Sequence, residues 1–222
     1  KNSIDSATIT GDIGNITNVG VSVAGNAQAN QNIGTINSNT VSGSNINIKT
    51  GSITNASADL AASSTSNQNV GSIDNSSSTN DTLVIDTVNS EIINTSVGLA
   101  ASSAARQNIG YVIGGSSNQS YLSIITKGAI LNTSAALAAN AKATQNIGLL
   151  SASSADQNKI TIDLNGKITN VGGALAGYAE ATQTIGTIQS ETANSNIINI
   201  ASSSISNSSG SLAASAVSKQ TI

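Results

Sequence analysis

The stretch ILNTSAALAANAKATQNIG at residues 130–148 decides the fold, because the same pattern recurs along the whole chain. One Gln recurs with spacings of 37, 39, 38, 38 and 37 residues, and an Asn always stands thirteen residues before it. Self-similarity at a fixed period is the signature of a repeat protein. The two columns are Gln31, Gln68, Gln107, Gln145, Gln183 and Gln220, and Asn18, Asn55, Asn94, Asn132, Asn170 and Asn207.

Other positions of the repeat are equally regular. Ile stands fifteen residues before the Gln, and Leu or Val stands eight before it with Ala next. Gly stands three residues after the Gln in every unit that extends so far. We therefore predict one repeat domain over 1–222, with units at approximately 1–36, 37–73, 74–112, 113–150, 151–188 and 189–222.

The period within the unit separates strand from helix. The Ala-rich residues 137–143 have high helix propensity, so a helix is the main alternative. Counting back from each Gln in steps of two, however, gives apolar or small residues, with mostly polar residues between them, and this alternation predicts strands. In the first unit these residues are Ala29, Ala27, Gly25, Val23, Val21 and Val19. The Ala after each Leu or Val, such as Ala138, breaks the alternation and predicts a bend or a second tight contact.

Composition limits the core and the classes of function. The chain has no Phe, Trp, Met, Cys, His or Pro, so a core of Ile, Val, Leu and Ala must be thin. A net charge of −3 without basic runs argues against nucleic-acid binding, and no apolar stretch approaches the ~20 residues of a membrane span. Abundant Ser and Asn are also typical of disorder, but the regular period argues against it. Without an initiator Met or signal peptide, we expect a mature or trimmed form.

Short strands at a fixed period predict an all-β fold, a β-solenoid whose layers stack at ~4.8 Å. A Gly-x-Ile element occurs twice per unit, which leaves open a winding of two layers per unit. That winding would place Gln on Ile48, Ile125 or Ile200, whereas one layer per unit places Gln on Gln and Asn on Asn. Because stacked amides satisfy one another's hydrogen bonds, we favour six stacked layers, each a repeat of ~38 residues.

Length variation is predicted to lie in polar loops. The Gly or Ser two positions before the Ile and the Gly after the Gln are always 20 positions apart. We therefore assign the variation to loops such as 74–81 and 151–158, which would project from one side of the stack. Stretches such as 46–48 and 160–162, with Ile at alternate positions, are predicted to close each unit as strands.

No catalytic arrangement is predicted, and the chain is not expected to be an enzyme. Without His or Cys there is no nucleophile and base pair, and no Asp or Glu occupies a repeated column. We expect no cofactor and no metal site. The acidic residues interpreted as solvated or loop charges are Asp59, Asp86, Glu91, Asp163 and Glu180.

The Asn, the Leu-Ala pair and the Ala-rich run before Gln-Asn resemble the imperfect repeats of Fap-type functional amyloid subunits, the fibre proteins of some bacterial biofilms. The resemblance implies a β-solenoid that stacks into an unbranched fibre, with the Gln and Asn columns as ladders. Unlike that family, this chain has six contiguous units and no Cys pair. Phrases such as Ile53-Thr54-Asn55 also resemble filamentous-haemagglutinin-like β-helices.

The two ends of the chain suggest how copies associate. Residues 1–13 resemble the closing half of a unit, with residues 7–9 as its strand, and the chain stops where that half should begin. We therefore expect head-to-tail homopolymers, although trimming would also explain the ends. Deletion of residues 1–13 is expected to abolish elongation.

Two functions remain open at this point. The first is a self-assembling extracellular filament subunit of a biofilm matrix or cell surface, with itself as partner and with the Gln and Asn columns as assembly residues. The second is a monomeric β-helical adhesin that binds a partner through its variable loops, where Tyr111 and Tyr121 are placed.

Overall fold

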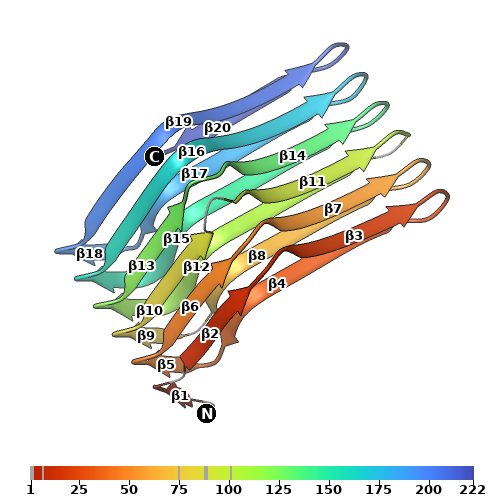
Figure 1. The fold of residues 1–222 in the computed structure, drawn as a ribbon. Helices are drawn as coiled ribbons and strands as arrows, with labels where there is room; N and C mark the ends of the chain where they lie inside the picture. The colour runs from red at the N-terminus through yellow and green to blue at the C-terminus, as the bar shows by residue number, and fades with distance from the viewer. Residues whose placement is uncertain (1–2, 7, 75, 88–89, 101) are drawn as a thin grey trace.

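The chain folds as a β-solenoid in which six layers stack along one axis (Figure 1). The computed structural model describes residues 3–6, 8–74, 76–87, 90–100 and 102–222. Within these residues there are twenty strands and no helix, divided between two ten-stranded sheets. Each layer runs along one sheet and returns along the other, so the predicted all-β solenoid is confirmed.

The two sheets are called sheet A and sheet B. Sheet A contains β1 (Ser3–Asp5), β4 (Ala27–Asn37), β5 (Thr40–Ser42), β8 (Ser64–Asp74), β9 (Ser77–Thr79), β12 (Ser103–Asn118), β15 (Ala141–Asp156), β17 (Ala179–Gln189), β18 (Thr192–Asn194) and β20 (Ala216–Thr221). Sheet B contains β2 (Thr8–Ile13), β3 (Ile16–Ser22), β6 (Asn45–Thr50), β7 (Ile53–Asp59), β10 (Thr82–Thr87), β11 (Ile92–Gly98), β13 (Tyr121–Thr126), β14 (Ile130–Ala136), β16 (Lys159–Ala174) and β19 (Ile197–Ser211).

Strands pair in parallel with the equivalent strands of the next unit, and the residues in register are equivalent residues. Gln31 pairs with Gln68, and Asn18 pairs with Asn55. The same register continues through the stack to Gln220, which pairs with Gln183. One unit therefore forms one layer, as predicted, and the winding with two layers per unit is wrong.

One half of each layer, which we call the body, encloses the large aliphatic side chains. Ile46 on β6 and its register partners Leu83, Leu122 and Ile160 are at most 3% exposed. They pack with residues such as Ile73 from the later part of the sheet A strands in one continuous core. Burial of these side chains removes most of the chain's large apolar surface from water and stabilises the fold.

The other half of each layer, which we call the arm, is thin. Here β3, β7, β11, β14 and the later parts of β16 and β19 lie against the first parts of the sheet A strands, and the two sheets join at tip turns (upper right in Figure 1). The inward side chains are small or polar, as at Asn55, Ser57, Ser64 and Ser66. Large aliphatic side chains do not fit where the sheets approach so closely.

The Gly that follows each Gln is required by the backbone and by packing. Gly110 has φ of +61°, in the left-handed region that side-chain-bearing residues rarely adopt. A Cβ there would lie 2.8 Å from the Cδ1 atoms of Leu122 and Ile124. The equivalent glycines Gly34, Gly71, Gly148 and Gly186 have φ of +60°, +62°, +62° and +55°.

The segments predicted as projecting loops are largely strand. β9 lies inside residues 74–81, and β15 continues through Asp156. Tyr111 lies within β12 and Tyr121 begins β13, so neither tyrosine sits in a loop. The prediction failed because polar Ser and Asn were interpreted as loop residues, although here they form strands that cover one side of the body.

Length variation lies at a corner of the layer instead. In each unit that contains both, the Gln and the residue in register with Thr50 are 19 residues apart. Thr50 and Ile53, by contrast, are 3 positions apart, whereas their register partners Thr87 and Ile92 are 5 positions apart. This corner joins the body to the arm on sheet B and tolerates insertions, as surface connections commonly do.

The predicted alternation is wrong beyond the tip turn. Ala27 and Ala29 face inward with Gln31, but Val21 is 71% exposed although it has the same parity. The bend at residues 23–26 changes which parity faces the interior. Of the two alternatives that the Ala after each Leu or Val left open, a bend or a second tight contact, the structure shows the bend.

Candidate functional site

The Gln column forms a continuous hydrogen-bonded ladder between the two sheets. Each Gln donates from Nε2 to Oε1 of the Gln in the preceding layer. The distances run from 2.9 Å for Gln68 to Gln31 down to 2.6 Å for Gln220 to Gln183. The four inner members, Gln68, Gln107, Gln145 and Gln183, are fully buried.

The Asn column forms a second ladder inside the arm. Each Asn donates from Nδ2 to Oδ1 of the Asn in the following layer, over 2.8 to 3.0 Å. Its four inner members, Asn55, Asn94, Asn132 and Asn170, are also fully buried. The structure therefore brings together both columns that the sequence singled out.

Both ladders also connect sheet A to sheet B. Gln145 comes from sheet A and donates to the backbone oxygen of Thr169 in sheet B at 3.3 Å. Asn132 comes from sheet B and donates to the backbone oxygen of Thr144 in sheet A at 3.0 Å. Every inner amide thus spends one N–H along the axis and another across it, which satisfies buried polar groups that would otherwise be costly.

The two ladders have opposite polarity. Side-chain N–H groups of the Gln column point toward the N-terminal end of the stack, whereas those of the Asn column point toward the C-terminal end. Gln31 and Asn18 close the ladders at one end, and Gln220 and Asn207 close them at the other. The direction of the ladders makes the two ends complementary, although Asn207 Nδ2 already donates to Ser218 Oγ at 2.9 Å and to the backbone oxygen of Lys219 at 2.7 Å.

A third ladder, of serines, was missed in the sequence. Ser57 Oγ lies 2.8 Å from Ser64 Oγ and donates to Ser96 Oγ at 3.2 Å. Ser134 donates to Ser103 Oγ at 3.0 Å. Its sequence signal is the Ser that stands two residues after the Asn in several units. The alternation counted back from the Gln assigned these Ser positions to the solvent-facing side of the strand, so the ladder was not predicted.

A fourth ladder runs along the outer surface of sheet A. Asn69 donates to Asn32 at 2.7 Å, Asn108 donates to Asn69 at 2.8 Å, and Asn146 donates to Asn108 at 2.9 Å. The Asn that follows the Gln in these units is its sequence signal. Because this ladder is open to water on one side, it contributes less to stability than the buried ladders.

One predicted solvated charge is instead buried. Asp59 is 2% exposed and accepts hydrogen bonds from the backbone N–H groups of Ala61 and Ala62, at 2.7 and 2.6 Å. It therefore holds the tip turn of its layer, a use of Asp common in turns. Of the other acidic residues, Glu91 and Asp163 are exposed as predicted, and Glu180 pairs with Lys142 at 3.3 Å.

Acidic and amide residues also occupy the turn that joins sheet A to sheet B at the body end of the layer, as between β9 and β10. Asp81 is 1% exposed and accepts from the backbone N–H groups of Ser44 at 2.9 Å and Thr79 at 3.1 Å. Two layers further on, Asn158 accepts in the same way from the backbone N–H of Ser120 at 3.0 Å. Both side chains are used to hold backbone, which makes them structural.

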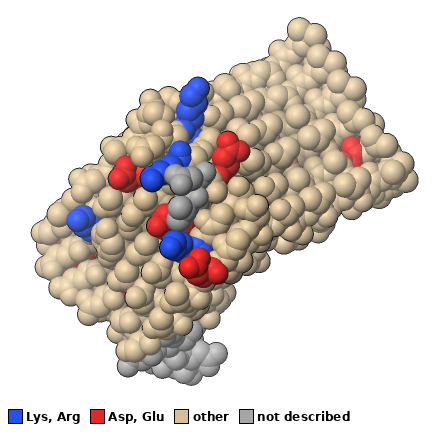
Figure 2. All heavy atoms as spheres, in the orientation of Figure 1, with Lys and Arg blue, Asp and Glu red and all other residues tan. Residues whose placement is uncertain are grey.

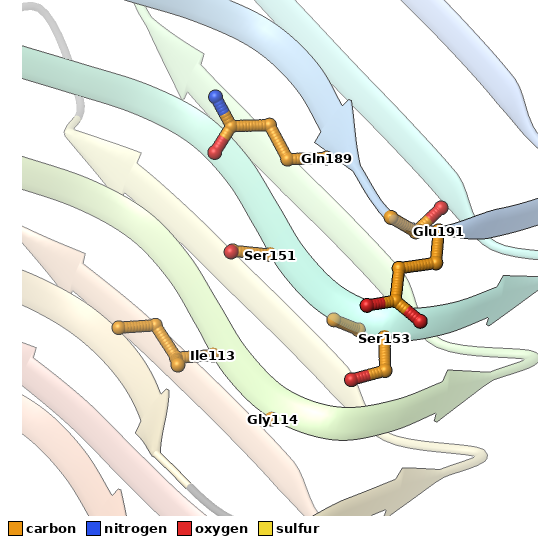
Figure 3. Close-up of a pocket in the computed structure, with 8 residues that line it drawn as sticks. Ile113, Gly114, Ser151, Ser153, Gln189 and Glu191 are labelled. Atoms are coloured by element: carbon orange, nitrogen blue, oxygen red, sulfur yellow. The ribbon is translucent and has the colours of Figure 1, made fainter.

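The surface carries a shallow depression of about 360 Å³ beside β15 and β17 (Figure 3). Ser151, Ser153, Gln189 and Glu191 line it, and Glu191 is its one titratable residue. Among the residues that the structure describes, no group of three acidic or other metal-binding side chains gathers. None of those residues belongs to a helix that is long and apolar enough to cross a membrane.

Comparison with known proteins adds no relative. No protein-family model, no curated protein and no solved structure matches the chain. The fold and the ladders identify it as a β-solenoid protein of about six turns.

Proposed function

We propose that this protein is the structural subunit of an extracellular filament, in a biofilm matrix or at a cell surface, and that copies join head to tail. The observation that carries the proposal is that layers stack through equivalent residues in register, so another layer of the same pattern can continue the stack. Ile160 is fully buried, whereas its register partner Ile198 in the last layer is 42% exposed although it faces the same core. A further layer of the same pattern would bury it.

The polarity of the ladders supports one direction of joining. In a head-to-tail contact, Gln31 would donate to the carbonyl of Gln220 of the next copy, and Asn207 would donate to the carbonyl of Asn18. In a head-to-head contact, donor would meet donor and acceptor would meet acceptor, which leaves polar groups unsatisfied. Such a head-to-tail contact does not close on itself, so it generates a fibre.

The same observations favour a structural role over catalysis. The amides of the inner ladders donate to one another and to the backbone, and Asp59 accepts from backbone N–H groups through Oδ1. Among the described residues, Asp59 Oδ2 and four other buried side-chain oxygens have no hydrogen-bond partner, and they are distributed over several layers. Amides that are committed to the ladders are not available to a reaction. We therefore propose no enzymatic activity and no cofactor, with the protein itself as the main partner.

Electron microscopy of the purified chain tests this proposal. We expect long unbranched fibres, and a layer spacing of ~4.8 Å in diffraction from aligned fibres. Monomeric particles at all concentrations would contradict the proposal and favour a monomeric adhesin.

Charges placed in the two end layers sharpen the test. Ile9→Lys and Ile198→Lys put an ammonium group on the core side of the first and last layers, where water reaches it only while the end is free. Stacking would bury this charge at high cost, so each variant should fold but form no fibres. Thr10→Lys and Asn199→Lys, on the outer face of the same strands, are the matched controls and should form fibres.

Mixing the two blocked variants tests the direction of joining. Each retains one functional end, so an equimolar mixture should form particles about twice as long, along the stack, as those of either variant alone, and growth should stop there. Doubled length in either variant by itself, seen by electron microscopy, would indicate head-to-head joining and contradict the ladder argument.

A further inference from the structure

One outer face of the arm carries an exposed aliphatic side chain in every layer of the stack, beside Ala, Gly, Thr and Ser. Eight of its side chains are exposed large hydrophobics: Val19, Val21, Val23, Leu60, Leu99, Leu137, Leu175 and Leu212, with exposed fractions between 42% and 81%. They lie on the outer side of sheet B or at its tip turns, in the columns of Val19, Val21 and Val23. Together with the column of Thr17, these outward residues form what we call the apolar stripe.

The apolar stripe carries no charge. None of the described residues in its four columns is Asp, Glu, Lys or Arg. Figure 2 shows this face of the molecule, and the charged atoms gather over the body while the part above the arm is almost bare of them. The opposite face of the arm is polar, with Arg106, Lys142, Glu180 and the outer Asn ladder. The arm thus consists of two sheets, with one outer face that is uncharged and rich in aliphatic side chains and another that is polar.

The apolar stripe has a ridge and, beside it, grooves into which an equivalent ridge of a second copy could pack. The Leu column forms a ridge near the tips, and beside it lie smaller side chains such as Ala58, Ala135 and Gly173. Two grooves follow this boundary, of about 340 Å³ next to Leu60 and about 170 Å³ next to Leu137. A second ridge with the same spacing would fit along them.

We propose that the apolar stripe is a lateral interface, and that its occupant is the apolar stripe of a second copy of this chain. A twofold axis parallel to the solenoid axis would place the Leu ridge of each copy over the small side chains of the other. It would also keep the layer spacing matched and both stacks pointing in the same direction, a self-complementary contact typical of homodimers. Facing sheets of this kind pack about 10 Å apart.

The size of the stripe is sufficient for a stable pair. Six layers at ~4.8 Å make it about 29 Å long, and four outward columns at about 6.7 Å make it roughly 20 Å wide. Pairing would therefore bury on the order of 1,200 Å² in total, within the range of specific protein interfaces. Exposed apolar areas of several hundred Å² are uncommon on soluble monomers.

Lateral pairing does not depend on end-to-end joining, and cross-linking separates the two. The chain has no Cys, so Val97→Cys on the stripe introduces a single thiol. Across the proposed interface the two thiols would lie within about 10 Å, whereas copies joined end to end would hold them roughly 29 Å apart. A bis-maleimide that spans about 10 Å should therefore give covalent dimers.

Thr144→Cys, on the opposite face of the arm, is the matched control and should give only the background of random collisions. Equal yields from both variants, or no dimer from Val97→Cys, would overturn the proposal. The end-blocking variant Ile198→Lys combined with Val97→Cys should still cross-link, so a failure of end-to-end joining leaves this result unchanged.

Charge on the ridge provides the second arm of the test. Leu99→Glu with Leu137→Glu, added to Val97→Cys, should lower the dimer yield at least about tenfold, because pairing would bury the carboxylates. Thr144→Glu with Thr182→Glu puts the same charge on the polar face and should leave the yield unchanged. Leu99→Ser with Leu137→Ser provides an uncharged variant, and circular dichroism checks that each protein is folded. Yields unaffected by the ridge substitutions would refute the interface.

Discussion

The body and the arm solve the same problem of stacking with different chemistry. In the body, Ile124 and its neighbours are held by burial of aliphatic side chains, which is strong but does not depend on exact register. In the arm, Asn132 and its neighbours are held by directional hydrogen bonds between identical residues. The difference teaches that the body supplies most of the stability, while the arm fixes the register in which one layer meets the next.

The largest effect is expected in the body. Ile124→Ala removes a fully buried side chain and leaves a cavity, so the free energy of unfolding should fall by about 3–4 kcal/mol. Ile125→Ala, one residue along and 39% exposed, should cost less than about 1 kcal/mol. Denaturant midpoints measure both, and similar losses for the two variants would show that the body is not packed as described.

Two glycines with nearly the same φ separate backbone strain from packing. Gly43→Ala, at φ of +60°, brings its Cβ no closer than 3.6 Å to Ser6 Oγ, so strain alone should cost about 1 kcal/mol. Gly110→Ala, at φ of +61°, also presses into Leu122 and Ile124 in the body and should cost about 3 kcal/mol. Equal shifts in the thermal midpoint would mean that the body yields easily around Gly110.

In the arm, loss of one inner amide should cost somewhat less. Asn132→Ala leaves Asn94 without its acceptor and Asn170 without its donor, so we expect a loss of about 2–3 kcal/mol. Asn108→Ala removes the same group from the outer ladder, where water replaces it, and should cost about 0.5 kcal/mol or less. Denaturant unfolding compares them, and equal costs would show that the buried ladder is not special.

The smallest effect concerns Tyr111, at the edge of the body. Burial raises the pKa of the Tyr111 phenol, and the nearby Asp74 carboxylate raises it further. Above pH 10 the unfolded chain therefore loses this proton before the folded chain does, so stability falls as the pH rises through that range. Tyr111→Phe should flatten this part of the stability profile slightly. An absorbance titration that shows Tyr111 ionising at its ordinary pKa would remove the effect.

The sequence predicted the inner ladders because they depend on period alone. Identical residues at a near-constant spacing, such as Gln107 and Gln145, must lie in register if each unit forms one layer, whatever the shape of that layer. The Ser ladder and the apolar stripe escaped prediction because both depend on which parity faces inward. The inward parity changes at the tip turn, because a bend of a few residues separates the two strands. Val21, before the bend, therefore faces outward, whereas Ala29, after it, has the same parity and faces inward.

The loops failed for a related reason. Polar composition in 74–81 and 151–158 predicts turns, but a parallel neighbour in register supplies hydrogen bonds that convert such a segment into strand. Local sequence contains no information about that neighbour. The corner where insertions are tolerated could be located only from the residues in register. Thr87 aligns with Thr126, and Ile92 aligns with Ile130, but the number of residues between Thr and Ile differs in the two layers.

By itself, the sequence determined the repeat, most of its strands and the inner columns of Gln and Asn, and it favoured a single layer per unit. Only the tertiary structure decided which strand faces point into the interior, how the layer is shaped, and in which direction each ladder runs. The physical reason is that periodicity is a property of the chain, whereas the inside and outside of a thin sheet pair exist only after the chain has folded back on itself.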